Sequence, residues 1–161
     1  MGTNAELYEQ DFYAWTQTTA ALIRAGKWHE ADTDSVAEEV ESLGKSDRRA
    51  LGSHLRNLVL HLLKWHYQPS GRQTGPSWRQ SIRNARAEIA VLLEDSPSLR
   101  QAVPPLIARW YPLAREDAAD ETGLPLATFP EVCPWTPKQI LDAEFWPEGE
   151  TPAPRRMGFN V

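Results

Sequence analysis

The first candidate chemistry in this sequence is metal binding by two histidines and two glutamates, namely His54, His61, Glu38 and Glu41. His54 and His61 are seven residues apart in one predicted helix, so they share a side of it but lie about 10 Å apart. One metal ion cannot bridge that distance, because its ligands lie about 2 Å from it. Ligands from a second helix are needed, and Glu38 or Glu41 can face His54 only if the chain turns back at Gly44.

The competing interpretation of His61 is structural. Helical bundles build carboxylate and histidine metal sites from a repeated Glu-x-x-His motif on two helices, and this sequence contains no such repeat. His61 would then be a core histidine that is hydrogen-bonded to a carboxylate or a carbonyl group. The residues firmly imply no cofactor, and a metal or small-ligand site remains an alternative.

The second candidate is a basic surface for a polyanion, formed by Arg72, Arg79, Arg83, Arg86 and Trp78. Arg79, Arg83 and Arg86 recur at i, i+4 and i+7, which places them on one side of a helix. Such a patch could bind phosphate groups while tryptophan stacks on a base. The alternative is that these arginines pair with the acidic residues between positions 116 and 121.

Charge is distributed in blocks along the chain. The net charge is −7 over residues 1–44, +8 over 45–86 and −6 over 87–161, which gives −5 in total. The basic block could bind nucleic acid, or it could pack beside the acidic blocks. The acidic total argues against a nucleic-acid partner, because an acidic molecule is repelled by phosphate backbones.

No catalytic constellation emerges from the sequence. Cys133 lies in an apolar loop without a nearby basic residue to lower its pKa. The stretch GRQTG, residues 71–75, lacks the GK[ST] ending of a phosphate-binding loop. Tryptophan and tyrosine are enriched at interfaces, and the chain has seven tryptophans. The sequence therefore favours a non-enzymatic module that binds a second copy of itself or another protein.

Apolar periodicity predicts an all-α fold, an antiparallel helical bundle with an extended C-terminal loop and a short terminal helix. We expect one domain over residues 1–147 and a tail over 148–161. Helices are predicted at about 5–25, at 36–43, after Ser46, after Ser77, at 97–122 with a break near 103 and a kink near 112, and at 137–143. The sequence leaves open whether the second and third of these are continuous across Gly44.

The chain has no features of a secreted or membrane protein. No apolar run approaches the length of a membrane helix, and no signal peptide is recognisable. The single cysteine cannot form an intrachain disulfide, which is typical of a reducing compartment. We therefore expect a cytoplasmic protein without a membrane partner.

Six stretches resemble, in order, the bacterial family catalogued as domain of unknown function 29. They are YEQDFYAWTQTTAALIRAG, VESLGKSDRRAL, LHLLKWHYQP, SWRQSIRNAR, LLEDSPSLR and CPWTPKQILDAEFWP. The resemblance runs from about Tyr8 to Pro147 and implies a small, cytoplasmic, all-helical bacterial protein. It implies no activity, because the family has no established function. His66 and the pair Pro104–Pro105 depart from the family pattern, so the start of the helix near those prolines is left open.

Overall fold

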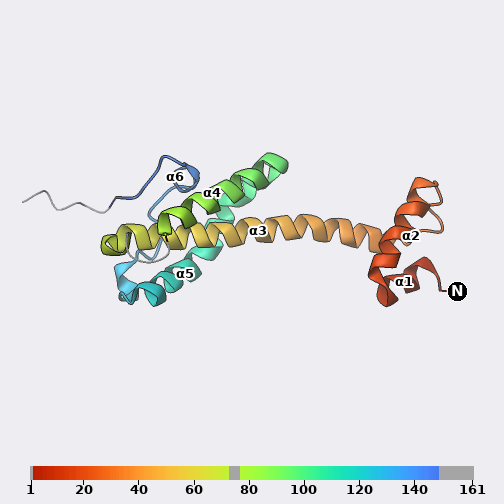
Figure 1. Cartoon of the computed structure of the whole chain (residues 1–161), viewed down its shortest axis with the longest axis horizontal. Coiled ribbons are helices and arrows are strands. Elements are labelled where there is room, and N and C mark those ends of the chain that lie inside the picture. Colours follow the sequence, from red (N-terminus) through yellow and green to blue (C-terminus); the bar gives the residue numbers. More distant parts are fainter. Residues whose placement is uncertain (1, 73–76, 149–161) are drawn as a thin grey trace, which may run out of the picture. The chain divides into compact units, whose positions relative to one another are not determined.

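The computed structural model describes residues 2–72 and 77–148. These residues form six α-helices, three short 3-10 helices and no strand, so the predicted all-α class is confirmed (Figure 1). None of the helices described there is both long enough and apolar enough to cross a membrane. The chain divides into two compact units, Met1–Asp47 and Arg48–Val161. All of the predicted tail except Glu148 lies outside the described residues.

The first unit begins with two helices where the sequence predicted one. Helix α1 spans Asn4–Gln10 and α2 spans Phe12–Arg24. Asp11 separates them because its backbone is extended (φ −152°) and its carboxylate accepts a hydrogen bond from the backbone N–H of Ala14 at 3.0 Å. Aspartate is a preferred residue for capping a helix in this way. The prediction of a single helix over residues 5–25 is therefore wrong at this one position.

Helix α2 ends close to the predicted residue 25, just before Gly26. Gly26 adopts the left-handed conformation with φ +74°. The N–H of Lys27 donates to the carbonyl of Leu22, and the N–H of Gly26 donates to the carbonyl of Ile23. This pair of bonds satisfies carbonyls that the last turn of a helix leaves free.

Helix α3 spans Thr33–Tyr67, 35 residues, and passes Gly44 without a break. Asp32 starts it by accepting a hydrogen bond from the N–H of Ser35 at 3.2 Å. Ser46 lies inside the helix and caps nothing. A glycine costs a helix only about 1 kcal/mol relative to alanine, so one long helix tolerates Gly44. The question that the sequence left open is settled in favour of continuity.

The second unit adds α4, Trp78–Asp95, the 3-10 helix η2, Pro97–Ala102, and α5, Val103–Thr122. Ser77 caps α4 as predicted, by accepting from the N–H of Gln80. The predicted break near 103 is the junction of η2 and α5. Pro104 and Pro105 lie in the first turn of α5, where a missing N–H costs nothing. Gly123 ends α5 with φ +72°.

The predicted loop over residues 69–76 is only partly described. Pro69–Arg72 forms the 3-10 helix η1. Residues 73–76, which include most of the GRQTG stretch, lie outside the described residues.

The core of the second unit forms around the C-terminal half of α3, along which α4 and α5 run (Figure 1). Leu51, Leu55, Leu58 and Leu62 of α3 are fully buried. They pack in one cluster with residues of α4 and α5, among them Ile82, Ile89, Leu106 and Tyr111. Gly52 allows α5 to approach closely, because a Cβ atom there would lie 2.7 Å from Nε1 of Trp110.

The C-terminal segment is held on this core by side chains of α5. Arg115 donates from Nε to the carbonyl of Phe129 at 2.9 Å, and Tyr111 donates to the carbonyl of Pro130 at 2.5 Å. The segment contains a 3-10 turn, η3 (Leu126–Thr128), and the short helix α6, Pro137–Leu141. The buried side chains of Phe129 and Ile140 anchor it in the core.

Candidate functional site

The four residues of the predicted metal site all lie on α3. Glu38 and Glu41 belong to the first unit, whereas His54 and His61 belong to the second. The turn at Gly44 that would bring glutamate and histidine together is not formed, because α3 is one helix. The described part of the chain holds no group of three or more histidine, cysteine, aspartate or glutamate side chains that could hold a metal ion.

His61 is a half-buried side chain tied to its own helix. Its Nδ1 lies 2.8 Å from the carbonyl oxygen of Asn57, one turn earlier in α3. Burial lowers the pKa of His61 below the usual 6.5, although the Asn57 carbonyl acts in the opposite direction. This geometry agrees with the structural interpretation, in which His61 is hydrogen-bonded to a carbonyl group. The side chain is half-buried, so it lies at the edge of the core and not at its centre.

Arginines and tryptophans alternate beside the start of α4. The guanidinium of Arg72 lies 4.7 Å from the ring of Trp65, and that of Arg79 lies 5.5 Å from the same ring. Arg79 also lies 4.8 Å from the ring of Trp146, and Arg86 lies 5.6 Å from it. Cations above aromatic rings are attracted by the ring electrons. We call this set, Arg72, Trp65, Arg79, Trp146 and Arg86, the arginine–tryptophan ladder.

Two arginines of the ladder are occupied by backbone carbonyls. Arg86 is only 6% exposed, and its Nε donates to the carbonyl of Ile140 at 2.8 Å, in the last turn of α6. Arg72 likewise donates from Nε to the carbonyl of Trp65 at 2.7 Å. Burial lowers the pKa of both guanidinium groups from the usual 12.5, yet both remain cations at neutral pH. These two residues therefore hold the C-terminal segment and the end of α3 in place.

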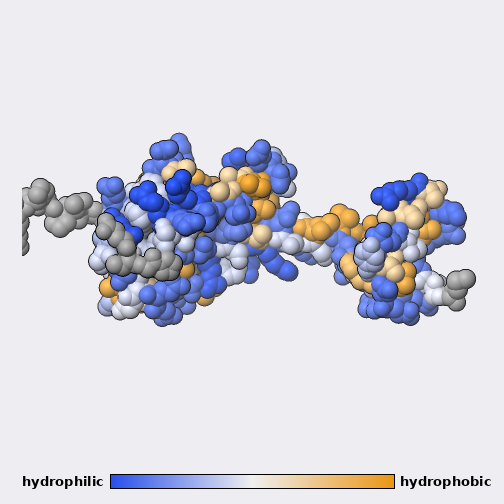
Figure 2. All heavy atoms as spheres, viewed as in Figure 1, coloured by the Kyte–Doolittle hydropathy of each residue, from blue (hydrophilic) through white to orange (hydrophobic). Residues whose placement is uncertain are grey.

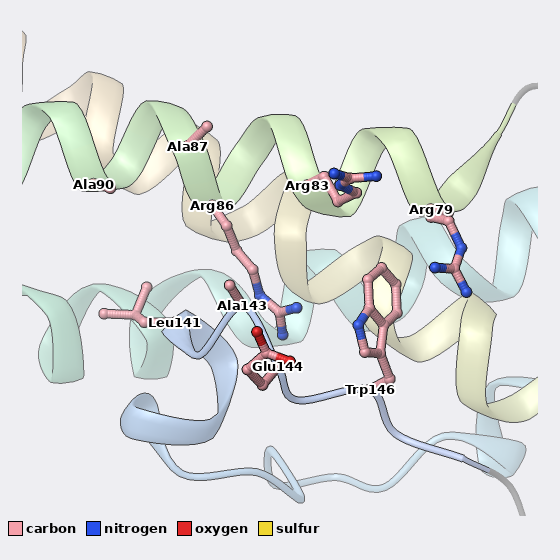
Figure 3. A pocket seen from close by; sticks show the side chains of 9 residues that line it. All are labelled: Arg79, Arg83, Arg86, Ala87, Ala90, Leu141, Ala143, Glu144 and Trp146. Atoms are coloured by element: carbon pink, nitrogen blue, oxygen red, sulfur yellow. The ribbon is translucent and has the colours of Figure 1, made fainter.

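A shallow groove of about 560 Å³ lies between α4 and the segment after α6 (Figure 3). Arg79, Arg83 and Arg86 line its α4 side, and Glu144 and Trp146 line the opposite side. A neighbouring hollow of about 460 Å³ continues past Arg86 to Arg100. The groove thus combines three arginine side chains with the ring of Trp146, several small or apolar side chains and one carboxylate, that of Glu144.

Two of the four carboxylates between positions 116 and 121 are engaged elsewhere. Asp117 of α5 pairs with Arg56 at 2.7 Å, and Glu121 pairs with Lys64 at 2.7 Å. Neither Arg79 nor Arg83 forms an ion pair within residues 2–72 and 77–148. The pairing that the sequence offered as the alternative to a basic surface is therefore not made by the α4 arginines.

Trp146, and not the predicted Trp78, is the tryptophan that lines the groove. Trp78 is buried against Gly71, with Lys64 Nζ 4.9 Å from its ring, so its ring belongs to the core. Trp146 borders the groove instead, between Arg79 and Arg86 (Figure 3). The sequence alone did not place Trp146 beside these arginines, because the contact joins residues about 60 positions apart in the chain.

Cys133 shows no sign of activation. Its thiol is half-buried and lies 3.5 Å from the carbonyl of Trp135, and burial raises its pKa from the usual 9.0. The neutral thiol is therefore the dominant form at neutral pH.

A different kind of surface covers the first unit. Among its described residues, 2–47, only Trp15 and Thr19 are buried, whereas five large apolar side chains are at least half exposed: Phe12, Tyr13, Trp28, Val40 and Leu43. Figure 2 shows hydrophobic atoms at the surface of this unit and along the middle of α3. Tyr8 anchors α1 to α3 by donating to Glu39 at 2.5 Å, which raises the pKa of Tyr8 to about 12.

The family assignment agrees with the resemblance noted in the sequence. The family model described as "Domain of unknown function DUF29" matches residues 7–146. The chain belongs to this family. No curated protein and no solved structure matches the chain.

Proposed function

We propose that this DUF29 protein is a non-enzymatic interaction module whose first unit carries the contact surface. The observation that supports this most directly is the exposure of Phe12, Tyr13 and Trp28 in a unit whose described residues include only two buried ones, Trp15 and Thr19. Large aromatic side chains supply most of the binding energy at protein interfaces. A surface of this kind is stabilised when a partner covers it.

A site-specific photo-crosslinker tests this proposal. Tyr13, which is 74% exposed, is replaced by a benzoyl-phenylalanine, and the full chain is irradiated in its native cell. We expect cross-linked products whose partner peptides mass spectrometry identifies as one defined protein. The control carries the same group at Val132, an exposed apolar position in the second unit. Equal, diffuse labelling at both positions, or none at Tyr13, would overturn the proposal.

A second candidate function is the binding of a phosphate-rich anion in the α4 groove. It is supported by Arg79 and Arg83, which no carboxylate neutralises within the described part of the chain, and by the adjoining ring of Trp146. The carboxylate of Glu144 lies in the same groove and opposes anion binding. Exposed arginines without an acidic partner attract phosphate oxygens, and their forked geometry suits them.

Calorimetric titration with inorganic tripolyphosphate tests this candidate. We expect binding that weakens as salt is raised and that is lost in the double variant Arg79→Ser/Arg83→Ser. Arg109→Ser is the matched control, because Arg109 is exposed on α5 outside the groove. Equal losses in both variants would mean a general charge effect, and unchanged binding in the double variant would exclude the groove.

A further inference from the structure

One face of α4 is hollowed along most of its length. Four residues at spacings of four, seven and four positions share that face of the helix: Arg79, Arg83, Ala90 and Glu94. Three hollows border the face, namely one of about 550 Å³ at Arg79 and Arg83, the groove of about 560 Å³, and the hollow of about 460 Å³ that reaches Arg100. All of their lining residues belong to the second unit. We call the three hollows together the α4 trough.

The trough is longer than a small anion needs. Arg79 and Glu94 are fifteen residues apart, which corresponds to about 22 Å along the helix axis. Ala87 lines the first two hollows and Ala90 lines the last two, so neighbouring hollows adjoin. A phosphate group held by Arg79 and Arg83 covers only one end of this length. The dimensions therefore fit a chain-like ligand.

The middle of the trough is lined by small and apolar side chains. Ala87 and Ala90 of α4 line it together with Leu141 and Ala143 of the C-terminal segment. Short side chains at a helix surface allow another segment to approach the helix closely. An apolar side chain of a ligand leaves water when it lies on such a surface, which favours binding.

Exposed arginines at both ends give the trough a positive charge. Arg79, Arg83 and Arg100 are exposed, and none of them forms an ion pair within the described part of the chain. Two carboxylates, those of Glu94 and Glu144, line the trough as well and oppose an anionic ligand. The cations outnumber these carboxylates, so the trough is complementary to a ligand with separated negative charges.

Arg86 adds a buried cation in the wall of the trough. It is only 6% exposed, and it lines both the groove and the hollow that reaches Arg100. Its Nε donates to a backbone carbonyl, but its Nη1 has no hydrogen-bond partner among the residues that the structure describes. Burial lowers the pKa of Arg86 and nearby Asp142 raises it, yet the two form no ion pair there. A buried cation attracts an anion more strongly than an exposed one, because less water screens its charge.

We infer that the α4 trough binds an acidic peptide segment of another protein. The carboxylates of the peptide pair with the exposed arginines, whose forked geometry suits them, and its apolar side chains lie along Ala87 and Ala90. The inference rests on the second candidate function, since both require that Arg79 and Arg83 attract an anion. It names the carboxylates of a peptide, and not a free phosphate, as that anion.

A nucleic-acid strand fits the trough less well than a peptide. It carries a negative charge at every phosphate, which Glu94 and Glu144 repel and the apolar middle does not satisfy. The ring of Trp146, which would have to stack on a base, already lies 4.9 Å from the ring of Trp65 and 4.8 Å from the guanidinium of Arg79. A peptide can place its charges at the arginines and its apolar groups between them.

Fluorescence anisotropy with a labelled synthetic peptide tests the inference. The probe is a peptide of about fifteen residues made of glutamate, leucine and alanine, which spans the trough even when it is helical. We expect the full chain to bind this probe with an affinity that falls as salt is raised. A peptide with lysine in place of glutamate is the charge control and should not bind. Tighter binding of a single-stranded DNA oligomer than of the acidic peptide would overturn the inference.

Filling the trough distinguishes a peptide from a small ion. Ala90→Phe places a ring at an exposed position in the middle of the trough, about 10 Å along the helix from Arg83. It should raise the dissociation constant of the acidic peptide at least about tenfold, because the ring occupies space that the peptide needs, and leave tripolyphosphate binding unchanged. Ala108→Phe is the matched control, because Ala108 is exposed on α5 and lines none of the three hollows. Equal peptide binding in the two variants would overturn the inference.

The inference and the second candidate function fail in different ways. A chain that binds tripolyphosphate through Arg79 and Arg83, but binds the glutamate peptide no more tightly than the lysine peptide, keeps the anion site and overturns the peptide as its ligand. A chain that binds neither tripolyphosphate nor the glutamate peptide overturns both proposals. Loss of peptide binding in Arg79→Ser/Arg83→Ser and in Ala90→Phe, but not in Ala108→Phe, is the result that supports the inference.

Discussion

Helix α3 passes through two different environments along one continuous stretch of backbone. In the first unit its apolar residues Val40 and Leu43 are mostly exposed, whereas in the second unit Leu55 and Leu58 are fully buried. The apolar spacing of three and four residues is the same in both halves. The difference lies in the neighbours, because the second half packs in one cluster with α4, α5 and the C-terminal segment. Identical sequence patterns thus support a core in one unit and a bare surface in the other.

The comparison indicates how each unit is stabilised. The second unit is stabilised by a cluster of more than twenty buried apolar residues. The burial of apolar surface is the dominant favourable contribution to the free energy of folding. The first unit relies on local devices, such as the capping box at Thr3, the Asp11 cap and the Tyr8–Glu39 bond. Small units with little buried surface are marginally stable on their own. Its exposed side chains are thus available for contact and contribute little to holding it together.

The largest expected effect comes from truncating leucines in the two halves of α3. Leu58→Ala should lower the free energy of unfolding by about 2–5 kcal/mol, because it removes a buried side chain and leaves a cavity. Leu43→Ala, its matched control on the same helix, should change it by less than about 0.5 kcal/mol. Urea unfolding of dilute protein measures both. A similar loss in the two variants would mean that Leu43 is covered within a single chain.

The two interior glycines of α3 sharpen the comparison. Gly52→Ala should destabilise by about 1–3 kcal/mol, because its Cβ would lie 2.7 Å from Nε1 of Trp110. Gly44→Ala meets open space and should stabilise the local helix by about 0.5–1 kcal/mol. Hydrogen exchange of the surrounding amides measures both effects locally. A destabilising Gly44→Ala would contradict the exposed placement of this stretch.

Hydrogen exchange can also test whether the hydrogen bond from Arg86 to the carbonyl of Ile140 holds the C-terminal segment in place. Arg86→Met removes the donor to the carbonyl of Ile140 and should cost about 1–2 kcal/mol. Amides of residues 137–147 should then exchange faster. Arg83→Met is the control, because Arg83 is exposed on the same helix and bonds to no backbone carbonyl among the described residues. Unchanged exchange in Arg86→Met would show that Phe129 and Ile140 suffice as anchors.

Local features of the sequence predicted much of the fold. The helix ends predicted near residues 25 and 122 and the start predicted after Ser77 were found as expected, because capping depends on one residue and its immediate neighbours. Asp11 was missed because the apolar spacing continues across it, and Gly44 was undecided because a helix accepts a single glycine.

The candidate sites were harder to predict than the helices. Trp146 borders Arg79 and Arg86 through a contact between distant parts of the chain, and periodicity carries no information about such contacts. The carbonyl partners of Arg86 are of the same kind, whereas the apolar spacing of Trp78, Ile82 and Ile89 already indicated that Trp78 faces inward. The arginine spacing on α4 did place Arg79, Arg83 and Arg86 in one groove, because residues on one helix face stay together whatever the tertiary structure.

The smallest expected effect is a pH dependence confined to the second unit. Burial lowers the pKa of His61 from 6.5 in the folded state, so the unfolded chain takes up a proton first as the pH falls. The contribution of His61 to the free energy of unfolding is therefore fully present above about pH 6.5. It declines below that pH until the folded-state pKa is reached. His61→Gln should flatten this decline in urea unfolding between about pH 7.5 and 5.5. His29→Gln, at an exposed position in the first unit, should leave it unchanged, and an unaltered slope in His61→Gln would assign the decline to another group.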